Sequence, residues 1–354
     1  MSIWNNIILF GTSRGKAVGV TLQNVPAGIK IDEDLITQML YRRKAKGVAD
    51  TARQENDVPN VLSGIYKGYT TGEPITVVFE NQDAEVKEDN RNSIPRPGHA
   101  DYTANIASKG LCDLRGGGAY SGRLTLGLVY AGAIAKQYLA LRDIEVLAKL
   151  QKIAYVADMP MDTVNPDLDA LIACQLLDIP MLNDAAREKS KQLIADARLQ
   201  GDSLSAGIEC MIYNLPAGLG GMHFSSLESV LSQGLFAIPA VKAVQFGDLP
   251  STLSFGSNYN DILYLQNENV KTITNHCGGV LGGRSNGMPV YFQVEMKPTP
   301  SIGIPQQTIN LKTKCETRIQ NTGRNDVCIG IRACPVVESV AALWAMYALQ
   351  EQVE

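Results

Sequence analysis

Apolar and polar positions follow two periods along the chain, and each period predicts one kind of element. Apolar residues that alternate with polar ones, or that run together over a few positions, predict strands. The predicted strands are 3–10, 17–23, 61–66, 75–80, 144–150, 208–212, 241–246 and 290–296. Apolar residues spaced by three and four positions predict helices. These helices begin after Asp32, at Leu124, at Asn183, at a Ser225-x-x-Glu228 capping box and at Pro335.

The helix predicted from Leu124 onward has little charge between Arg123 and Lys136, so we expect it to be buried on nearly all sides. Its apolar positions are Leu124, Leu128, Ala131, Ala135 and Leu139. Strands and helices do not alternate as regular βαβ units, and no linker divides the chain. The pattern therefore predicts one α+β domain over residues 1–354, with antiparallel sheets around a central buried helix.

Composition narrows the class of protein further. Apolar residues make up 45% of the chain, and the formal net charge of −4 gives no general reason to bind nucleic acid or an anionic membrane. Seven cysteines without a C-x-x-C pair fit reduced thiols in the cytoplasm better than disulfides or a zinc site, and no metal site is expected. The N-terminus lacks the features of a signal peptide, and no run of about 18 apolar residues predicts a membrane span.

The stretch from Arg96 to residue 140 combines the groups that an active site for an anion needs. His99 lies in a polar loop, and Gly116–Gly118 precede Arg123 and the buried helix. A glycine turn that leads into a helix presents free amide groups to an anion. A plain tight turn before a core helix is the alternative, and the glycine pattern alone favours it. The spacing excludes a P-loop.

Three other loops and one basic cluster could contribute to such a site. Gly278–Gly287 contains five glycines in ten residues, Lys297–Ser301 offers a cation and two hydroxyls, and Gly323–Asp326 places an arginine beside a carboxylate. The cluster Arg42–Lys46 ends a predicted helix. A phosphate site is one interpretation of this cluster, and a solvated helix end is the favoured one.

These stretches together resemble the chorismate synthase family along nearly the whole chain. The matching segments are Arg96–Thr103, Asp113–Gly118, Ala131–Lys136, Pro216–Gly220, Ile238–Gly247, Gly278–Gly287, Lys297–Ile302 and Gly323–Pro335. The resemblance implies a β-α-β sandwich in a homotetramer. It also implies a trans-1,4 elimination that converts 5-enolpyruvylshikimate-3-phosphate to chorismate and phosphate in the shikimate pathway. Reduced FMN is the implied cofactor, and NADP is associated with the family.

The resemblance also assigns roles to particular residues. His99 matches an acid near the flavin, Asp326 an aspartate linked to proton removal, and Ser13 a serine beside an active-site histidine that is Arg14 here. Arg123 matches an arginine of the substrate region. Positions that match flavin contacts are Ser121, Ala240, Gly282, Lys297, Pro298, Thr299, Pro300, Ser301 and Arg324. The loops that hold them are expected to converge around the flavin.

The chain departs from the family pattern mainly at these positions. The family's Gly-Glu-Ser-His-Gly is Gly-Thr-Ser-Arg-Gly at 11–15, and its Arg-His-Asp is Arg-Asn-Asp at 324–326. An arginine can hold a phosphate but cannot donate a proton near neutral pH. The sequence therefore leaves three interpretations open: a divergent chorismate synthase, an FMN-using homologue with another substrate, and a non-catalytic paralogue.

Overall fold

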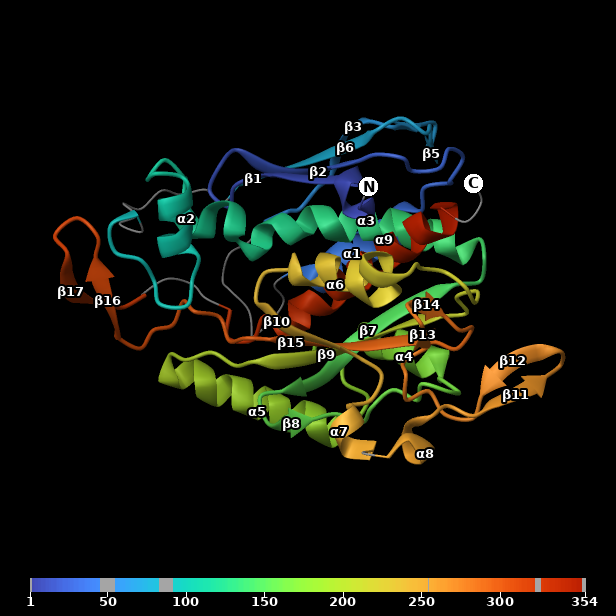
Figure 1. The fold of residues 1–354 in the computed structure, drawn as a ribbon. Coiled ribbons are helices and arrows are strands. Elements are labelled where there is room, and N and C mark those ends of the chain that lie inside the picture. Colours follow the sequence, from blue (N-terminus) through green and yellow to red (C-terminus); the bar gives the residue numbers. More distant parts are fainter. Residues whose placement is uncertain (1, 45–54, 83–91, 254, 322–325, 352–354) are drawn as a thin grey trace.

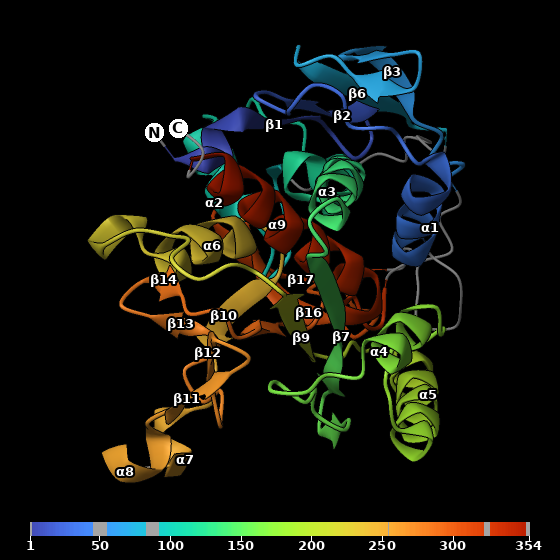
Figure 2. The ribbon, with the colours of Figure 1, turned by 90° about the vertical axis from the view of Figure 1, so that its right-hand side faces the viewer.

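Two antiparallel sheets enclose a layer of helices, which gives a β-α-β sandwich (Figures 1 and 2). The computed structural model describes residues 2–44, 55–82, 92–253, 255–321 and 326–351. This arrangement confirms the predicted α+β class, with antiparallel sheets around central helices. The prediction of a single domain over residues 1–354 stays a prediction.

The first sheet has four strands in the order β1-β2-β6-β3. Its strands are β1 (Ile7–Gly11), β2 (Ala17–Leu22), β6 (Ile75–Glu80) and β3 (Asn60–Ser63). The predicted hairpin of β1 and β2 is confirmed, although Ile3–Asn6 form a 3-10 helix before it. The strand predicted over 61–66 is divided, because the chain turns at Gly64 with φ +82°. Its second half, β4 (Ile65–Tyr66), pairs with β5 (Tyr69–Thr70).

The second sheet has five strands in the order β10-β15-β9-β7-β8. These strands are β10 (Val241–Phe246), β15 (Val290–Met296), β9 (Ala206–Tyr213), β7 (Glu145–Ile153) and β8 (Val156–Ala157). The four longest of them were predicted. The outer face of this sheet is covered by α4 (Leu168–Gln175) and α5 (Asp184–Gln200) (Figure 1). The helix predicted from Asn183 is confirmed as α5, with Asn183 as its cap and a left-handed Gly201 at its end.

Four helices fill the space between the sheets. They are α1 (Glu33–Arg43), α3 (Thr125–Ala140), α6 (Leu227–Phe236) and α9 (Gly330–Glu351). Helix α3 is buried along almost its whole length, as predicted. It crosses α9 closely, because a methyl group at Gly132 would lie 2.2 Å from Ser339 Cβ. Helix α9 is long and apolar enough to span a membrane. However, 94% of its most apolar 18-residue stretch is buried within the protein, so α9 is a core helix.

Two predicted helix starts are wrong. Helix α9 begins at Gly330, five residues before Pro335, and the proline lies inside it. A proline there removes one backbone hydrogen bond, which the packed core tolerates. Helix α6 is capped by Ser226, whose Oγ accepts a hydrogen bond from Ser229 N at 3.1 Å, so the predicted Ser225 capping box is displaced by one residue.

The remaining elements lie at the two ends of the sandwich. At one end are α2 (Asp101–Ala107), β16 (Gln306–Asn310) and β17 (Cys315–Ile319) (Figure 1). At the other are α7 (Pro250–Leu253), α8 (Gly256–Tyr259), β11 (Leu263–Gln266), β12 (Asn269–Thr272), β13 (Val280–Leu281) and β14 (Arg284–Ser285). Short 3-10 helices span Gly122–Leu124 and His223–Ser225, and the 3-10 segment Arg115–Tyr120 is interrupted by non-helical backbone at Gly116–Gly118. The candidate site lies toward the α2 end.

Candidate active site

The glycine run Gly116–Gly118 is the centre of the candidate site. All three residues have positive φ, at +60°, +99° and +55°, a conformation that side-chain-bearing residues rarely adopt. A methyl group at Gly118 would lie 2.0 Å from Asp113 O, so the turn is also too tight for one. The run brings four predicted site residues together, namely Ser13, Arg14, His99 and Ser121.

His99 is held on one side and faces the glycine run on the other. Its Nδ1 lies 2.6 Å from Asp101 Oδ1, and its side chain is 15% exposed. A methyl group at Gly117 would lie only 3.3 Å from His99 Nε2. The absence of a side chain at Gly117 therefore leaves space beside Nε2.

The β1–β2 turn carries Ser13 and Arg14 to the same glycines. Ser13 is buried, and its amide donates to Gly118 O at 3.1 Å. A methyl group at Gly116 would lie 3.2 Å from Ser13 Oγ and 3.0 Å from Arg14 Cγ. Asn81 fixes the turn, since its Nδ2 donates to Thr12 O and Gly15 O at 3.1 and 2.9 Å. Serine, arginine and histidine thus surround one backbone turn.

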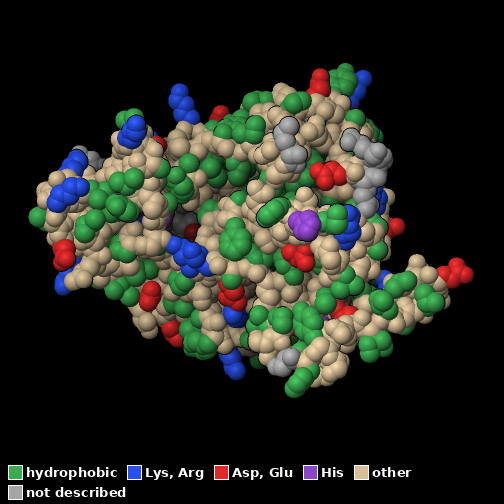
Figure 3. All heavy atoms as spheres, viewed as in Figure 1, with side chains coloured by type: hydrophobic (Ala, Val, Ile, Leu, Met, Phe, Trp, Pro, Cys, Tyr) green, Lys and Arg blue, Asp and Glu red, His purple; other side chains and the backbone are tan. Residues whose placement is uncertain are grey.

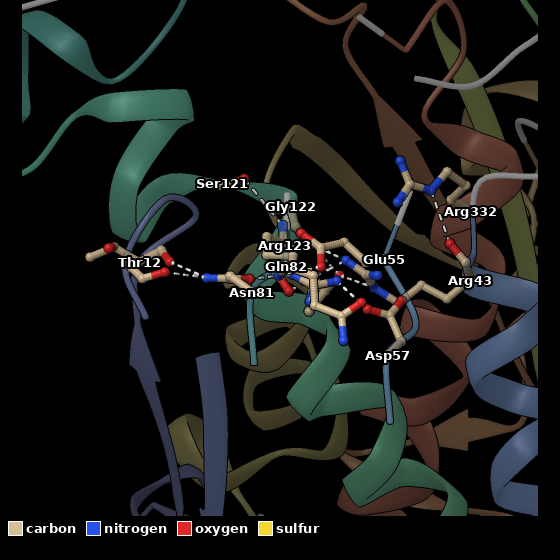
Figure 4. Close-up of polar contacts among 12 residues, drawn as sticks. Thr12, Arg43, Glu55, Asp57, Asn81, Gln82, Ser121, Gly122, Arg123 and Arg332 are labelled. Carbon is tan, nitrogen blue, oxygen red and sulfur yellow. Dashed lines mark hydrogen bonds and ion pairs between the residues drawn. The ribbon is translucent and has the colours of Figure 1, made fainter. Parts of the chain in front are cut away.

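Arg123, the predicted substrate arginine, is bound to the chain's own acids (Figure 4). Its guanidinium forms an ion pair with Asp57 and lies 3.9 Å from Glu55, and its Nε donates to Asn81 Oδ1 at 3.0 Å. Ser121 lies next to it, and Ser121 Oγ accepts from Arg123 N at 3.2 Å. The helix start is therefore capped by a serine side chain.

The basic cluster at the end of α1 is buried where the structure describes it, so the predicted solvated helix end is wrong for Arg42 and Arg43. The two arginines point to different sides, and Arg43 turns toward the site. Its Nε donates to Thr125 Oγ1 at 3.0 Å and its Nη2 to Gly122 O at 2.7 Å. Residues 45 and 46 lie outside the described residues.

Arg43 is a buried cation with charges of both signs around it. Burial is the main cause that lowers its pKa to about 9; Arg332 and Arg123 lower it further, whereas Asp57 and Asp326 raise it. Arg332 donates from Nε to Arg43 O at 2.9 Å (Figure 4), and it also pairs with Asp326 at 2.8 Å. Three arginines therefore lie close together here, with Asp57 and Asp326 as acidic partners.

The loop 297–301 joins this region from the end of β15. Lys297 donates to Gly98 O through Nζ, and its amide donates to Ala240 O at 3.0 Å. Ala240 has a left-handed φ of +76°, which costs energy for a residue with a side chain. Two hydroxyls complete the loop's contacts. Thr299 Oγ1 donates to Asp326 O at 2.6 Å, and Ser301 Oγ accepts from Arg96 Nη1 at 2.9 Å.

The surface of the molecule is hollowed on the face that Figure 3 shows. Figure 3 shows a hollow between the lobe of α2, β16 and β17 and the rest of the sandwich, with Lys or Arg side chains at its edge. Pro300 belongs to the same contacts, because a methyl group at Gly98 would lie 3.4 Å from its Cβ. Pro298 follows Lys297 in the same loop.

Gly282 is not brought to the other predicted residues within this chain. It lies in the β13–β14 turn, and the adjoining Gly279 packs against Val290, the first residue of β15. Lys297 follows the last residue of β15, and a seven-residue strand is roughly 20 Å long. The expected convergence of loops therefore holds for 297–301 and does not include Gly282. Arg324 lies outside the described residues.

Several residues of the site were not predicted from the sequence. Arg96 and Asp101 flank His99 in one motif, so their spacing was an available signal. Asp57 and Arg123 are separated by 66 positions, and no local pattern links them. Among the described residues, no group of three or more His, Cys, Asp or Glu side chains could hold a metal ion.

An α+β sandwich that gathers an imidazole, a serine and an arginine around a glycine turn has the form of an enzyme site for a small anion. The chain belongs to the chorismate synthase family, a family of lyases, since the family model described as chorismate synthase matches residues 6–349.

Relatives and a solved structure agree with this membership. A chorismate synthase of Pyrococcus abyssi is 42% identical over 337 residues, which cover 94% of this chain and 92% of that protein. One of Dehalococcoides mccartyi is 41% identical over 341 residues, with 95% and 92% covered. A crystal structure of chorismate synthase matches with a TM-score of 0.77 at 24% identity, over 98% of this chain and 91% of the other, and this likeness supports the fold alone.

Proposed function

We propose that this protein converts 5-enolpyruvylshikimate-3-phosphate to chorismate and phosphate with reduced FMN, as a chorismate synthase of the shikimate pathway. The observation that carries the proposal is the family match over residues 6–349, together with His99, Ser13 and Arg14 around one glycine turn. The reaction is a trans-1,4 elimination. The C–O bond to phosphate breaks, the phosphate leaves with the electron pair, a proton leaves carbon, and a new double bond forms.

The arginines supply what a departing phosphate needs. The phosphate gains negative charge as its bond breaks, so preorganised cations lower the barrier. Arg14 lies beside the glycine run, and Arg43, whose hydrogen bonds to described residues end on neutral oxygens, is a second cation of the region. In this proposal His99 Nε2 is the atom that gives or takes a proton, because it faces the open side of Gly117. Asp326, held by Arg332, is the proposed base.

Reduced FMN fits the region where Ala240 meets the loop 297–301. Lys297 offers a point charge to an anionic group of the flavin, and its own backbone amide is held by Ala240 O. The proposed contacts are Ser121, Ala240, Lys297, Pro298, Thr299, Pro300, Ser301 and Arg324; Gly282 is left out because it lies at the other end of β15 within this chain. When bound, reduced flavin supplies transient electron density to the substrate. The proposal also includes NADP as a source of the electrons that reduce the flavin.

We also propose a homotetramer in the cytoplasm. The arm formed by β11 and β12 exposes apolar side chains, among them Leu263, Leu265 and Val270 at 61%, 74% and 53%. Exposed apolar surface of this kind marks interaction sites. All seven cysteines are free, which fits a reducing compartment.

An anaerobic assay with chemically reduced FMN tests the function directly. We expect release of phosphate from 5-enolpyruvylshikimate-3-phosphate together with the absorbance of chorismate. Flavin binding without phosphate release would favour a homologue with a different substrate. No change in flavin fluorescence at high micromolar FMN would favour a non-catalytic paralogue.

A further inference from the structure

We propose that Asp101 is a positioning residue that fixes the tautomer of His99, so that Nε2 alone exchanges a proton on the side of Gly117. The catalytic consequence rests on the proposed function. The tautomer itself is a property of the protein and can be measured without substrate or flavin.

Both carboxylate oxygens of Asp101 are fully used as hydrogen-bond acceptors. Asp101 is completely buried. Its Oδ2 accepts from Arg96 N and Arg96 Nε at 3.0 and 2.7 Å. Its Oδ1 accepts from Arg96 Nη2 at 2.8 Å and lies 2.6 Å from His99 Nδ1. A carboxylate offers about four acceptor directions, so all of them are used.

Asp101 is ionised in this environment. Burial by itself would raise its pKa, but hydrogen bonds from Arg96 and His99 outweigh burial and hold the pKa below its ordinary value. An ionised carboxylate only accepts hydrogen bonds. His99 Nδ1 must therefore carry its hydrogen, and the neutral ring has its lone pair on Nε2.

Arg96 cannot take over the role of Asp101. Its Nη2 lies 3.1 Å from His99 Nδ1 and 3.3 Å from Nε2, beside the ring. A guanidinium has no acceptor, so it cannot receive the Nδ1 hydrogen. The other charged groups near this loop are Lys297, which donates to Gly98 O, and Arg14, beside Gly116. Both are cations, so Asp101 is the acceptor for Nδ1 among these neighbours.

The protein contains a second His–Asp pair that serves as a control. His276 Nδ1 lies 2.7 Å from Asp248 Oδ2, close to the geometry of the first pair. The Asp248 side chain is 50% exposed, whereas that of Asp101 is 0% exposed. Water can replace an exposed carboxylate as a hydrogen-bond partner. A tautomer held by burial should therefore depend on Asp101 much more strongly than that of His276 depends on Asp248.

Nitrogen-15 NMR of the histidine rings tests the proposal. The chain has three histidines, and His223→Gln and His276→Gln variants assign the signals. Long-range proton–nitrogen spectra are recorded near pH 8.5, about two units above the ordinary histidine pKa of about 6.5. We expect His99 to be protonated at Nδ1. Predominant Nε2–H in the unchanged protein would overturn the proposal, and this measurement requires no variant of Asp101.

Asp101→Asn should reverse the tautomer. With its oxygen at the Oδ2 position the new side chain keeps two Arg96 donors, whereas the opposite orientation would keep only Arg96 Nη2, so the amide NH₂ faces His99 Nδ1. Nδ1 must then accept, and the hydrogen moves to Nε2. Elimination should fall roughly 10²–10⁴-fold, the range for a lost acid–base group. Asp248→Asn should leave both the His99 signals and activity unchanged.

Retention of Nδ1–H in a folded Asp101→Asn variant, checked by its circular dichroism spectrum, would refute the positioning role. If the unchanged protein releases no phosphate but has the Nδ1–H tautomer, the proposed function fails and the positioning role stands.

Discussion

Helix α1 ends with two consecutive buried arginines that serve opposite regions of the molecule. Arg42 points into the core and forms a two-point ion pair with Glu338, at 3.2 and 2.7 Å. Lys136 pairs with the same carboxylate, and Gln175 donates to it at 2.8 Å. The hydrogen bonds that Arg43 makes to described residues end on neutral oxygens of Gly122, Arg123 and Thr125.

The two arginines therefore differ in charge balance rather than in burial. Burial alone would lower the pKa of Arg42, but Glu338 outweighs it and raises that pKa. The pKa of Arg43 is lowered to about 9. A buried charge with a matched partner stabilises a fold only if the pair remains intact. A buried cation on neutral acceptors retains a potential that can attract an anionic ligand.

The largest expected effect is on catalysis, in the candidate site to which Arg43 turns, at His99. His99→Ala should lower elimination roughly 10²–10⁴-fold, because an acid–base group is lost. Stability should fall by about 1–3 kcal/mol, because the buried Asp101 carboxylate loses one of its hydrogen-bond donors. His223→Ala and His276→Ala are matched controls at histidines outside the glycine run. Equal rates in all three variants would remove His99 from the mechanism.

The next largest effect is on folding stability, in the core around Arg42. Glu338→Ala leaves Arg42 and Lys136 buried without their shared carboxylate, and breaking such a pair costs about 3–5 kcal/mol. Urea unfolding measures the loss. Glu188→Ala, which removes the exposed partner of Lys191, should cost less than about 1 kcal/mol. Similar losses in both variants would show that the core pair has no special weight.

The sequence predicts features whose interacting residues are close along the chain better than features whose partners are far apart in sequence. The β1–β2 hairpin and α3 were predictable, because alternation and helical spacing are local signals. The solvated interpretation of Arg42 was wrong because its partner Glu338 lies 296 positions away. Helix α2 and the β16–β17 hairpin were not predicted either, since their polar surfaces give little periodicity. The His99 loop and the glycine run were recognised from sequence, whereas the acids that hold Arg123 were not.

A smaller effect is expected from Arg43→Met. Removing this cation should weaken binding of the phosphorylated substrate roughly tenfold, the scale of a charge acting through a partly polar interior. Folding should change by less than it does in Glu338→Ala, because Thr125 Oγ1 also donates to Gly122 O at 2.6 Å. The Michaelis constant and urea unfolding report these two effects separately. A large loss of stability with unchanged substrate affinity would reverse the contrast between the two arginines.

The acid limb of the stability curve gives the smallest and most specific effect. Glu338 is buried, which alone would raise its pKa, but Arg42 and Lys136 lower the pKa below its ordinary value. Its stabilisation is therefore present above the unfolded pKa of about 4.3 and is lost as pH falls through the folded value. Below about pH 5 the unfolded chain binds more protons, so stability should rise with pH more steeply in the unchanged protein than in Glu338→Gln. The difference in slope is at most about 1.4 kcal/mol per pH unit for one proton. Arg43→Met should retain the steep slope, because Arg43 does not pair with Glu338. Parallel curves for the unchanged protein and Glu338→Gln would mean that the carboxylate is not ionised in the core, and the comparison between the two arginines would then fail.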